Sequence, residues 1–517
     1  MSSKFRNLSV VSITALLVVM TGPVSAYEAS RGPTEVIYWD PQKAYSGYTM
    51  VKVQRIDGHY LIDMAGQVVN YFPDFNDAYL QEDGTIFGFL GNKTFAIRDW
   101  EGQTLWEYTE PREDYSPHHD FLRIYNAELE DYTILYIANA RVMQDEAIEL
   151  GANPDYAERY QNAQMDAIVE IDSNGTVVWE WRFRDHLVQD IDPSKQNYVD
   201  SIADYPQRLD INWGVVQRDY LHCNGLDYNP EIGHVAISCN FTNEIYIIDH
   251  DGTFVAGDPE ESIELAAGEA GDFLYRFGSP VNYGQGEHPY YAKNHYALQE
   301  FSGHRQVGGV HDIQWIKDGF PGAGNLLLFN NGMSVPRAYG DANPQAEFME
   351  IDPYLGENGV EQEGYVNPPE AGYTNMMPGG RRPPGSGPTA SRRLFSNQIV
   401  SMYNTAHGFS SYHGSAVQRL PNGNTIAQLA YLGRMVELTP DGEVVWDYVN
   451  PVTWGGEIVK TLITTDPDHK NTMNGWSPFR WAPDYPGLAG KDLSPKGLIT
   501  EFGTMGGEAD LPVEEQY

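Results

Sequence analysis

Four short histidine motifs contain the residues of this chain that are best suited to chemistry. Each stands at the entry to a predicted β-hairpin, and they read His118-His119-Asp120-Phe121, His222-Cys223-Asn224-Gly225, His311-Asp312-Ile313 and His413-Gly414-Ser415. Neutral imidazoles bind metal ions, exchange protons near neutral pH and attack as nucleophiles. A lone histidine is more often a hydrogen-bonded core residue. Four at equivalent repeat positions favour a shared site, although repeat duplication also copies structural histidines.

Arg337 helps to choose among these chemistries, because it closes the hairpin that starts at His311. A guanidinium beside a metal ion is electrostatically unfavourable, whereas its planar fork suits a tetrahedral oxyanion such as sulfate or phosphate. Imidazole and guanidinium donors together stabilise charge on transferring oxygens. The residue types therefore favour anion group transfer, with no metal and no cofactor. No phosphate-binding glycine loop follows a strand, which disfavours a nucleotide-linked donor.

The elements that must position these residues are a set of repeats with the pattern apolar-x-apolar-x-Asp-x-x-Gly-x-apolar-apolar-Trp-x-aromatic. Copies or partial copies occupy 61–72, 95–108, 168–181, 245–255, 348–352 and 435–448. Most combine two alternating apolar segments with a tight glycine turn, which is the signature of a hairpin. A second type of hairpin precedes most of them, at 79–90, 221–239, 311–330 and 413–430.

Two hairpins make a four-stranded sheet, and such a sheet cannot bury both faces by itself. Radial packing of the sheets solves this problem, so the sequence predicts an all-β protein, a six-bladed β-propeller with long loop insertions. A count of five or seven blades is an alternative, because the first and fifth repeats are irregular. The inner strands of a propeller line its axis, so equivalent histidines on different blades should converge there. A short helix near 145–160 is the one clear exception to the β pattern.

Three segments lie outside the repeats. Residues 1–26 have the charged, apolar and small-residue regions of an N-terminal signal peptide, which predicts a periplasmic or secreted protein. The Pro- and Gly-rich stretch 356–393 is expected to be a long surface loop carrying Arg381, Arg382, Arg392 and Arg393, either solvated or acting as a lid for an anionic substrate. The propeller domain would then span 27–451, with 452–517 as a C-terminal extension wrapping its outer surface.

Charge and cysteine content narrow the function further. The chain holds 33 Lys+Arg against 72 Asp+Glu, a formal charge of −39, which disfavours nucleic-acid and membrane-surface partners. Its two cysteines, Cys223 and Cys239, lie symmetrically about a turn and would face each other across a hairpin. Export permits a disulfide there. The alternative is two separate buried thiols.

The last repeat resembles the bacterial arylsulfotransferase (aryl-sulfate sulfotransferase) family. The resemblance rests on Arg419-Leu-Pro-Asn-Gly-Asn-Thr-Ile426 and the segment 434–451, with further similarity at 222–228 and 310–312. It spans roughly 63–451 and implies a six-bladed propeller that works in the periplasm without the nucleotide sulfate donor. The implied reaction moves a sulfuryl group from a phenolic sulfate ester to a phenol acceptor through a covalent sulfohistidine.

The resemblance also implies roles for individual residues. His413 would be the nucleophile, His222 and His311 would bind sulfate oxygens or shuttle the phenolic proton, and Arg337 would hold the anion. His119 and Asn224 would assist around the substrate, and Trp315 and Tyr412 would form aromatic walls for the phenyl ring.

Two other functions are compatible with the same pattern. One is a propeller enzyme with a metal or quinone cofactor in the channel, and the other is a non-catalytic propeller that binds a partner on its acidic rim. A homodimer stays open, since nothing in the sequence bears on the oligomeric state.

Overall fold

The computed structural model describes residues 32–52, 58–157, 162–213, 219–285, 305–332, 347–355, 396–403, 411, 414–452, 458, 460–462 and 479–502. The predicted signal peptide 1–26, the Arg-rich stretch 356–393 and the site residues Arg337, Tyr412 and His413 lie outside these described residues. Among the residues described, no helix is long and apolar enough to cross a bilayer.

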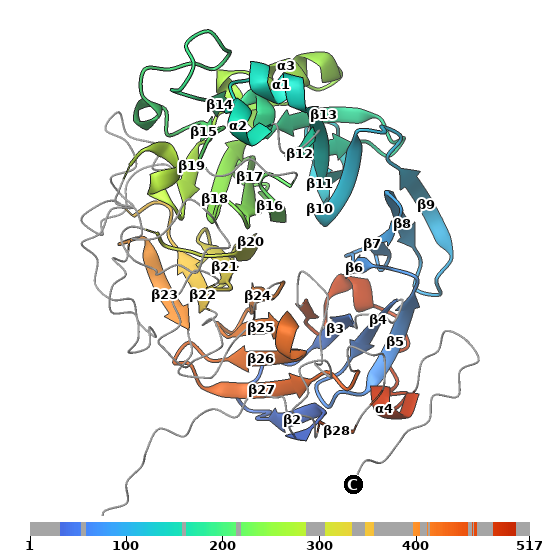
Figure 1. The fold of residues 1–517 in the computed structure, drawn as a ribbon. Coiled ribbons are helices and arrows are strands. Elements are labelled where there is room, and N and C mark those ends of the chain that lie inside the picture. The colour runs from blue at the N-terminus through green and yellow to red at the C-terminus, as the bar shows by residue number, and fades with distance from the viewer. Residues whose placement is uncertain are drawn as a thin grey trace, which may run out of the picture.

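Six antiparallel sheets stand in a ring around a central axis, which confirms the predicted six-bladed β-propeller (Figure 1). From the axis outward, blade 1 contains β29 (Arg480–Trp481), β3 (Tyr48–Lys52), β4 (Gly58–Ile62) and β5 (Val68–Pro73), and blade 2 contains β6 (Asp77–Leu80), β7 (Ile86–Gly91), β8 (Thr94–Arg98) and β9 (Thr104–Thr109). Blade 3 contains β10 (Tyr115–Asn126), β11 (Asp131–Met143), β12 (Asn162–Ile171) and β13 (Val177–Arg182), and blade 4 contains β16 (Cys223–Asn229), β17 (His234–Cys239), β18 (Glu244–Asp249) and β19 (Tyr275–Phe277). Blade 5 contains β20 (Val310–Trp315), β21 (Leu326–Asn330), β22 (Glu347–Ile351) and β23 (Ile399–Tyr403), and blade 6 contains β24 (Ala416–Arg419), β25 (Thr425–Leu429), β26 (Arg434–Leu438), β27 (Val444–Val449) and β2 (Glu35–Trp39).

Smaller elements connect and flank the blades. Short strand pairs are β1 (Gly32–Pro33) with β28 (Thr461–Leu462), and β14 (Leu187–Val188) with β15 (Leu209–Asp210). The α-helices are α1 (Gln144–Glu149), α2 (Pro154–Ala157), α3 (Pro259–Ala267) and α4 (Ile499–Phe502). The 3-10 turns are η1 (Phe183–Asp185), η2 (Ile202–Asp204), η3 (Asp251–Thr253), η4 (Glu269–Gly271), η5 (Pro280–Tyr283), η8 (Ala430–Leu432) and η9 (Pro486–Leu488). The helix expected near 145–160 is thus present as two short pieces, and α3 was not expected.

The Asp-x-x-Gly turns of the repeat have a local cause. In blade 3, the Asp172 carboxylate accepts the backbone N–H groups of Asn174 and Thr176 at 2.9 and 2.8 Å, and Gly175 takes a φ of 79°. Asp63 and Asp99 hold the equivalent turns of blades 1 and 2 in the same way. The aspartate replaces backbone partners inside the turn, and glycine accepts the left-handed conformation without a steric penalty.

Each sheet buries both faces because each lies between two neighbours. Six hydrophobic clusters fill the six blade junctions of the ring, from blades 1 and 2 round to blades 6 and 1. Strand β21 shows the alternation, since Leu326 and Leu328 face blade 4 while Leu327 and Phe329 face blade 6. The radial arrangement therefore supplies the burial that an isolated four-stranded sheet lacks.

Carboxylates join the inner strands across three successive junctions. Asp120 Oδ2 accepts the amide N–H of Leu226 at 2.9 Å, and Asp312 Oδ2 accepts that of Val417 at 2.7 Å. Between them, Asp227 Oδ2 accepts the N–H of Trp315 at 2.7 Å. Asp120 and Asp312, which follow histidines in the motifs, therefore have a structural role. They hold the inner strands, and the histidines before them, in fixed relative positions.

The two ends of the described chain close the ring. Strand β2 pairs with β27 on the outside of blade 6, and β29 forms the axial strand of blade 1. The expected outer wrapping of the tail after Val452 is therefore wrong for β29, which lies at the centre. Further on, Lys496 and Gly497 exchange backbone hydrogen bonds with Val68 on the outer strand β5. The tail thus crosses blade 1 from the axis to its outer edge.

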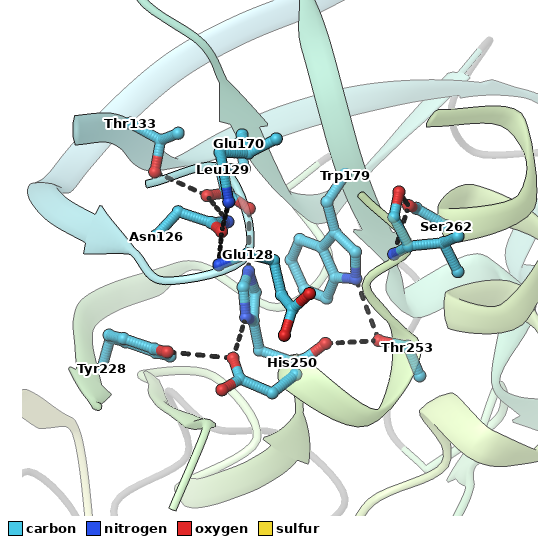
Figure 2. A network of polar contacts seen from close by, with 12 residues as sticks. Asn126, Glu128, Leu129, Thr133, Glu170, Trp179, Tyr228, His250, Thr253 and Ser262 are labelled. Atoms are coloured by element: carbon cyan, nitrogen blue, oxygen red, sulfur yellow. Dashed lines mark hydrogen bonds and ion pairs between the residues drawn. The ribbon is translucent and has the colours of Figure 1, made fainter. Parts of the chain in front are cut away.

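Cys223 and Cys239 are directly opposed in the β16–β17 hairpin and form a disulfide, as the turn symmetry predicts. Beside this hairpin, a polar network centred on His250 links blades 3 and 4 (Figure 2). His250 bonds through Nε2 to Glu170 Oε2 at 2.8 Å and through Nδ1 to Asp251 Oδ1 at 2.7 Å, with both carboxylate oxygens as acceptors, and its ring packs on Trp179.

Candidate active site

The histidine motifs stand where the inner strands of blades 3, 4 and 5 begin, and their backbone is irregular there. His119 (φ 57°) lies in a bulge of β10, and His222 (φ 55°) immediately precedes β16. Left-handed conformations are uncommon for residues other than glycine and cluster at functional sites. The two rings lie together, with centroids 4.7 Å apart and planes 73° apart.

Asp166 and His118 form a chain of polar contacts that leads to His119. Asp166 on β12, which is 1% exposed, bonds through Oδ1 to Nε2 of His118 at 2.8 Å. His118 Nδ1 lies 2.6 Å from His119 Nδ1. The other Asp166 oxygen accepts the amide N–H of Cys223 at 3.2 Å, which ties the carboxylate to blade 4.

His222 is held on both its edge and its face. Its Nδ1 lies 2.6 Å from Asp219 Oδ2, three residues earlier, and its ring stacks on Phe241 at 4.8 Å. A carboxylate at Nδ1 makes that nitrogen the donor in the neutral ring. His222 therefore presents Nε2 as its reactive edge.

His311, on β20, is 2% exposed and has an unambiguous tautomer. Asn331 donates through Nδ2 to the carbonyl oxygens of Ser411 and Gly414, at 3.0 and 3.1 Å, so its Oδ1 faces His311 Nδ1 at 2.6 Å. His311 must then donate from Nδ1 and accept at Nε2. The Gly414 amide donates to that Nε2 at 3.2 Å. His311 and Asn331 thereby hold the backbone directly after His413.

The cluster disfavours positive charge on its central ring. Desolvation, followed by the proximity of His118, His222 and His311, holds the pKa of His119 well below the ordinary histidine value. His119 is therefore neutral at physiological pH, as a general base or nucleophile must be. Close by, burial raises the pKa of the Asp120 carboxyl to about 7, against the lowering effect of its amide hydrogen bonds.

Of the predicted site residues, the structure brings together His119, His222 and His311. Asn224 is fully buried. Its side chain donates to the Val310 carbonyl and accepts from the Ser238 hydroxyl, and the first of these bonds joins blades 4 and 5. Within the described ranges, no group of three or more His, Cys, Asp or Glu side chains is arranged to hold a metal ion.

Trp315 lies elsewhere. It stands four residues after His311, roughly 13 Å along the strand, and lines a cavity of about 430 Å³ at the other end of the axis. All six inner strands contribute to this cavity, and Phe121, Phe320 and Trp481 add further aromatic walls. The predicted aromatic wall for the histidine site is thus displaced, for Trp315, to the opposite end of the channel.

Sequence reasoning missed the carboxylates behind the imidazoles. Asp219 had a local signal, since it precedes His222 by three residues. Asp166 had none, because it is 48 residues from His118 and meets it only across the blade. Asn331 follows a predicted strand end without any motif that marks a histidine partner.

The fold and site together define a six-bladed propeller with imidazoles from successive blades gathered at the start of its inner strands. A family model described as Arylsulfotransferase (ASST) matches residues 34–346, which is more than half of the chain. The chain therefore belongs to the arylsulfotransferase family, and this membership supports an arylsulfotransferase activity on small aryl sulfates and phenols in general terms. The matched range includes His119, His222 and His311 and ends before His413.

Three of the similar solved structures share little sequence with this chain. A protein of unknown function from Bacteroides caccae is 11% identical, covers 84% of this chain and 100% of its own, and has a TM-score of 0.41. A functionally unknown protein from Desulfotomaculum acetoxidans is 8% identical, covers 85% and 100%, and has a TM-score of 0.33. Virginiamycin B lyase from Staphylococcus aureus is 10% identical, covers 72% and 69%, and has a TM-score of 0.28. The comparison with curated proteins finds no match.

Proposed function

We propose that this protein is an exported sulfotransferase that moves a sulfuryl group from a phenolic sulfate ester to a phenol, with His413 as the nucleophile. The observation that carries the proposal is the hydrogen bond between the Gly414 amide and His311 Nε2, which joins the residue after His413 to the imidazole cluster. The described residues nearest to the proposed nucleophile in the sequence, Ser411 and Gly414, are thus held by His311 and Asn331.

The chemistry follows a two-step exchange. A neutral His413 nitrogen attacks sulfur, the new N–S bond forms as the S–O bond to the aryl group breaks, and a phenolate leaves. The acceptor oxygen then attacks the same sulfur, the N–S bond breaks, and the acceptor proton passes to a neutral imidazole of the cluster. Arg337 and His222 would stabilise the negative charge that the sulfuryl and aryl oxygens share in both transition states.

Two features support export and a donor without a nucleotide. Disulfides persist mainly in oxidising compartments, and the Cys223–Cys239 bond agrees with the signal-like segment 1–26. The sequence has no phosphate-binding glycine loop after a strand. Cleavage of that segment and export are tested by N-terminal sequencing of the protein recovered outside the cytoplasm.

The test of activity uses purified protein with 4-nitrophenyl sulfate, with and without phenol. We expect nitrophenolate release that accelerates with phenol, phenyl sulfate as product, and ping-pong kinetics. His413→Ala should lower turnover by at least about 1,000-fold and abolish covalent labelling by a sulfur-35 donor. His234→Ala is the matched control, because His234 lies at the opposite end of the β16–β17 hairpin from the cluster.

Two results would count against the proposal. If folded protein releases no phenolate from any of a panel of aryl sulfates, the proposed activity is refuted. If His413→Ala shows normal turnover and labelling, the sulfotransferase activity stands but His413 is not its nucleophile.

A further inference from the structure

The contacts of His118 and His119 leave few arrangements of their hydrogens. With Asp166 ionised, His118 donates from Nε2, so its Nδ1 carries a lone pair in the neutral ring. The 2.6 Å contact between the two Nδ1 atoms then requires a hydrogen on His119 Nδ1. His119 Nε2 is consequently an acceptor, and whatever contacts it must donate.

Addition of one proton reverses this polarity without moving a heavy atom. A proton that arrives at His119 Nε2 is compensated when the Nδ1 hydrogen of His119 passes to His118 Nδ1. His118 then becomes an imidazolium that donates from both nitrogens, to Asp166 and to His119. The positive charge comes to rest beside a buried carboxylate, away from the centre of the imidazole cluster.

We propose that Asp166, His118 and His119 form a proton relay for the phenolic oxygens, with His119 as the catalytic acid–base residue and the other two as positioning residues. This inference rests on the proposed function, and it adds residues and a role to it. Among the cluster members with described contacts, His119 has another imidazole between it and a carboxylate, whereas His222 meets Asp219 directly and His311 meets an amide.

The proton balance closes over one catalytic cycle. In the first half-reaction the protonated relay donates from His119 Nε2 to the departing phenolate oxygen, and the relay becomes neutral. In the second, the acceptor hydroxyl gives its proton to His119 Nε2 as the O–S bond forms and the N–S bond to His413 breaks. The relay returns to its starting state, and no further reactant is needed.

Asp166→Asn tests the relay, because asparagine inverts its polarity. With Oδ1 accepting from the Cys223 amide, the asparagine Nδ2 would donate to His118 Nε2. His118 would then donate from Nδ1, and His119 would accept at Nδ1 and carry its hydrogen on Nε2. A neutral His119 in this state cannot take the acceptor proton.

The diagnostic measurement is how each rate depends on the basicity of the phenol that leaves or accepts the sulfuryl group. Nitrophenolate leaves without a proton, so nitrophenolate release from 4-nitrophenyl sulfate in single-turnover experiments should change less than about threefold in Asp166→Asn. Cleavage of phenyl sulfate and transfer to phenol should each fall about 100-fold, the usual contribution of general acid–base catalysis. Asp272→Asn is the matched control, since Asp272 pairs with buried His186 at 2.9 Å away from the histidine motifs. We expect it to leave all three rates unchanged.

His118→Ala provides a second test, because it removes the middle group of the relay and keeps Asp166 itself. The His118 side chain is 15% exposed, so solvent reaches the place that it leaves. We expect the same selective loss, and partial rescue of phenol transfer by added imidazole. Equal loss for both donors, without rescue, in variants that melt like wild type would overturn the relay. If wild type releases no nitrophenolate, the proposed function fails instead, so the two failures are distinguishable.

Discussion

Replacement of His250 by glutamine should remove a pH-dependent part of the stability of the blade 3–blade 4 junction. His250 is 1% exposed and bonds to Glu170 and Asp251, while Glu170 also accepts from Asn126 and Thr133 (Figure 2). Burial disfavours the charged ring, but the hydrogen bonds to Asp251 and Glu170 outweigh it and raise the pKa of His250 to about 9.

The sign and the size of the change in stability with pH follow from this pKa. The folded-state value lies above the ordinary value of 6.5, so the folded protein holds a proton that the unfolded chain releases. The stabilisation is complete below pH 6.5, falls as pH rises, and is lost above about pH 9. A difference of roughly two to three pKa units corresponds to about 3 kcal/mol, without a large screening correction because the ring is buried.

The assay is equilibrium urea unfolding followed by tryptophan fluorescence, since Trp179 packs against His250. Wild type should lose about 3 kcal/mol of unfolding free energy between pH 6 and pH 9.5 relative to His250→Gln. The variant should be less stable at pH 6 and approach wild type at pH 9.5. Parallel pH profiles for the two proteins would refute the reasoning, because the proton uptake would then lie elsewhere.

Three further outcomes follow from the described contacts. Replacement of Cys223 and Cys239 by serine should lower the unfolding free energy, measured by denaturant titration, by about 3 kcal/mol. Dithiothreitol should reproduce this loss in wild type and have no effect on the variant. Arg480→Ala should lower the unfolding free energy by about 3–5 kcal/mol, because it leaves the buried Glu437 carboxylate without its counter-charge beside β29. A thermal melt unchanged from wild type would contradict this. Asn331→Ala releases the His311 ring and the backbone carbonyls of Ser411 and Gly414, so kcat for sulfuryl transfer should fall about tenfold or more. An unaltered kcat would argue against that positioning role.

Much of the propeller is determined locally. The Asp172 carboxylate bonds to amides two and four residues later, and Gly175 supplies the turn, so one short segment contains everything that makes its hairpin. The disulfide is local in the same sense, since its cysteines are 16 residues apart in a single hairpin. The repeated placement of histidines at hairpin entries likewise predicts that His119, His222 and His311 converge.

Contacts that join different strands of the ring were decided by the tertiary structure alone. Asp166 reaches His118 from another strand of blade 3, and Asp312 meets Val417 from 105 residues away. Strand β29 carries no pattern that marks it as the axial strand of blade 1, because a strand of two residues has no periodicity to read. Turn chemistry acts over a few residues and is written in the chain, whereas the partners of a buried carboxylate, and the end of the channel that Trp315 faces, depend on how six sheets pack.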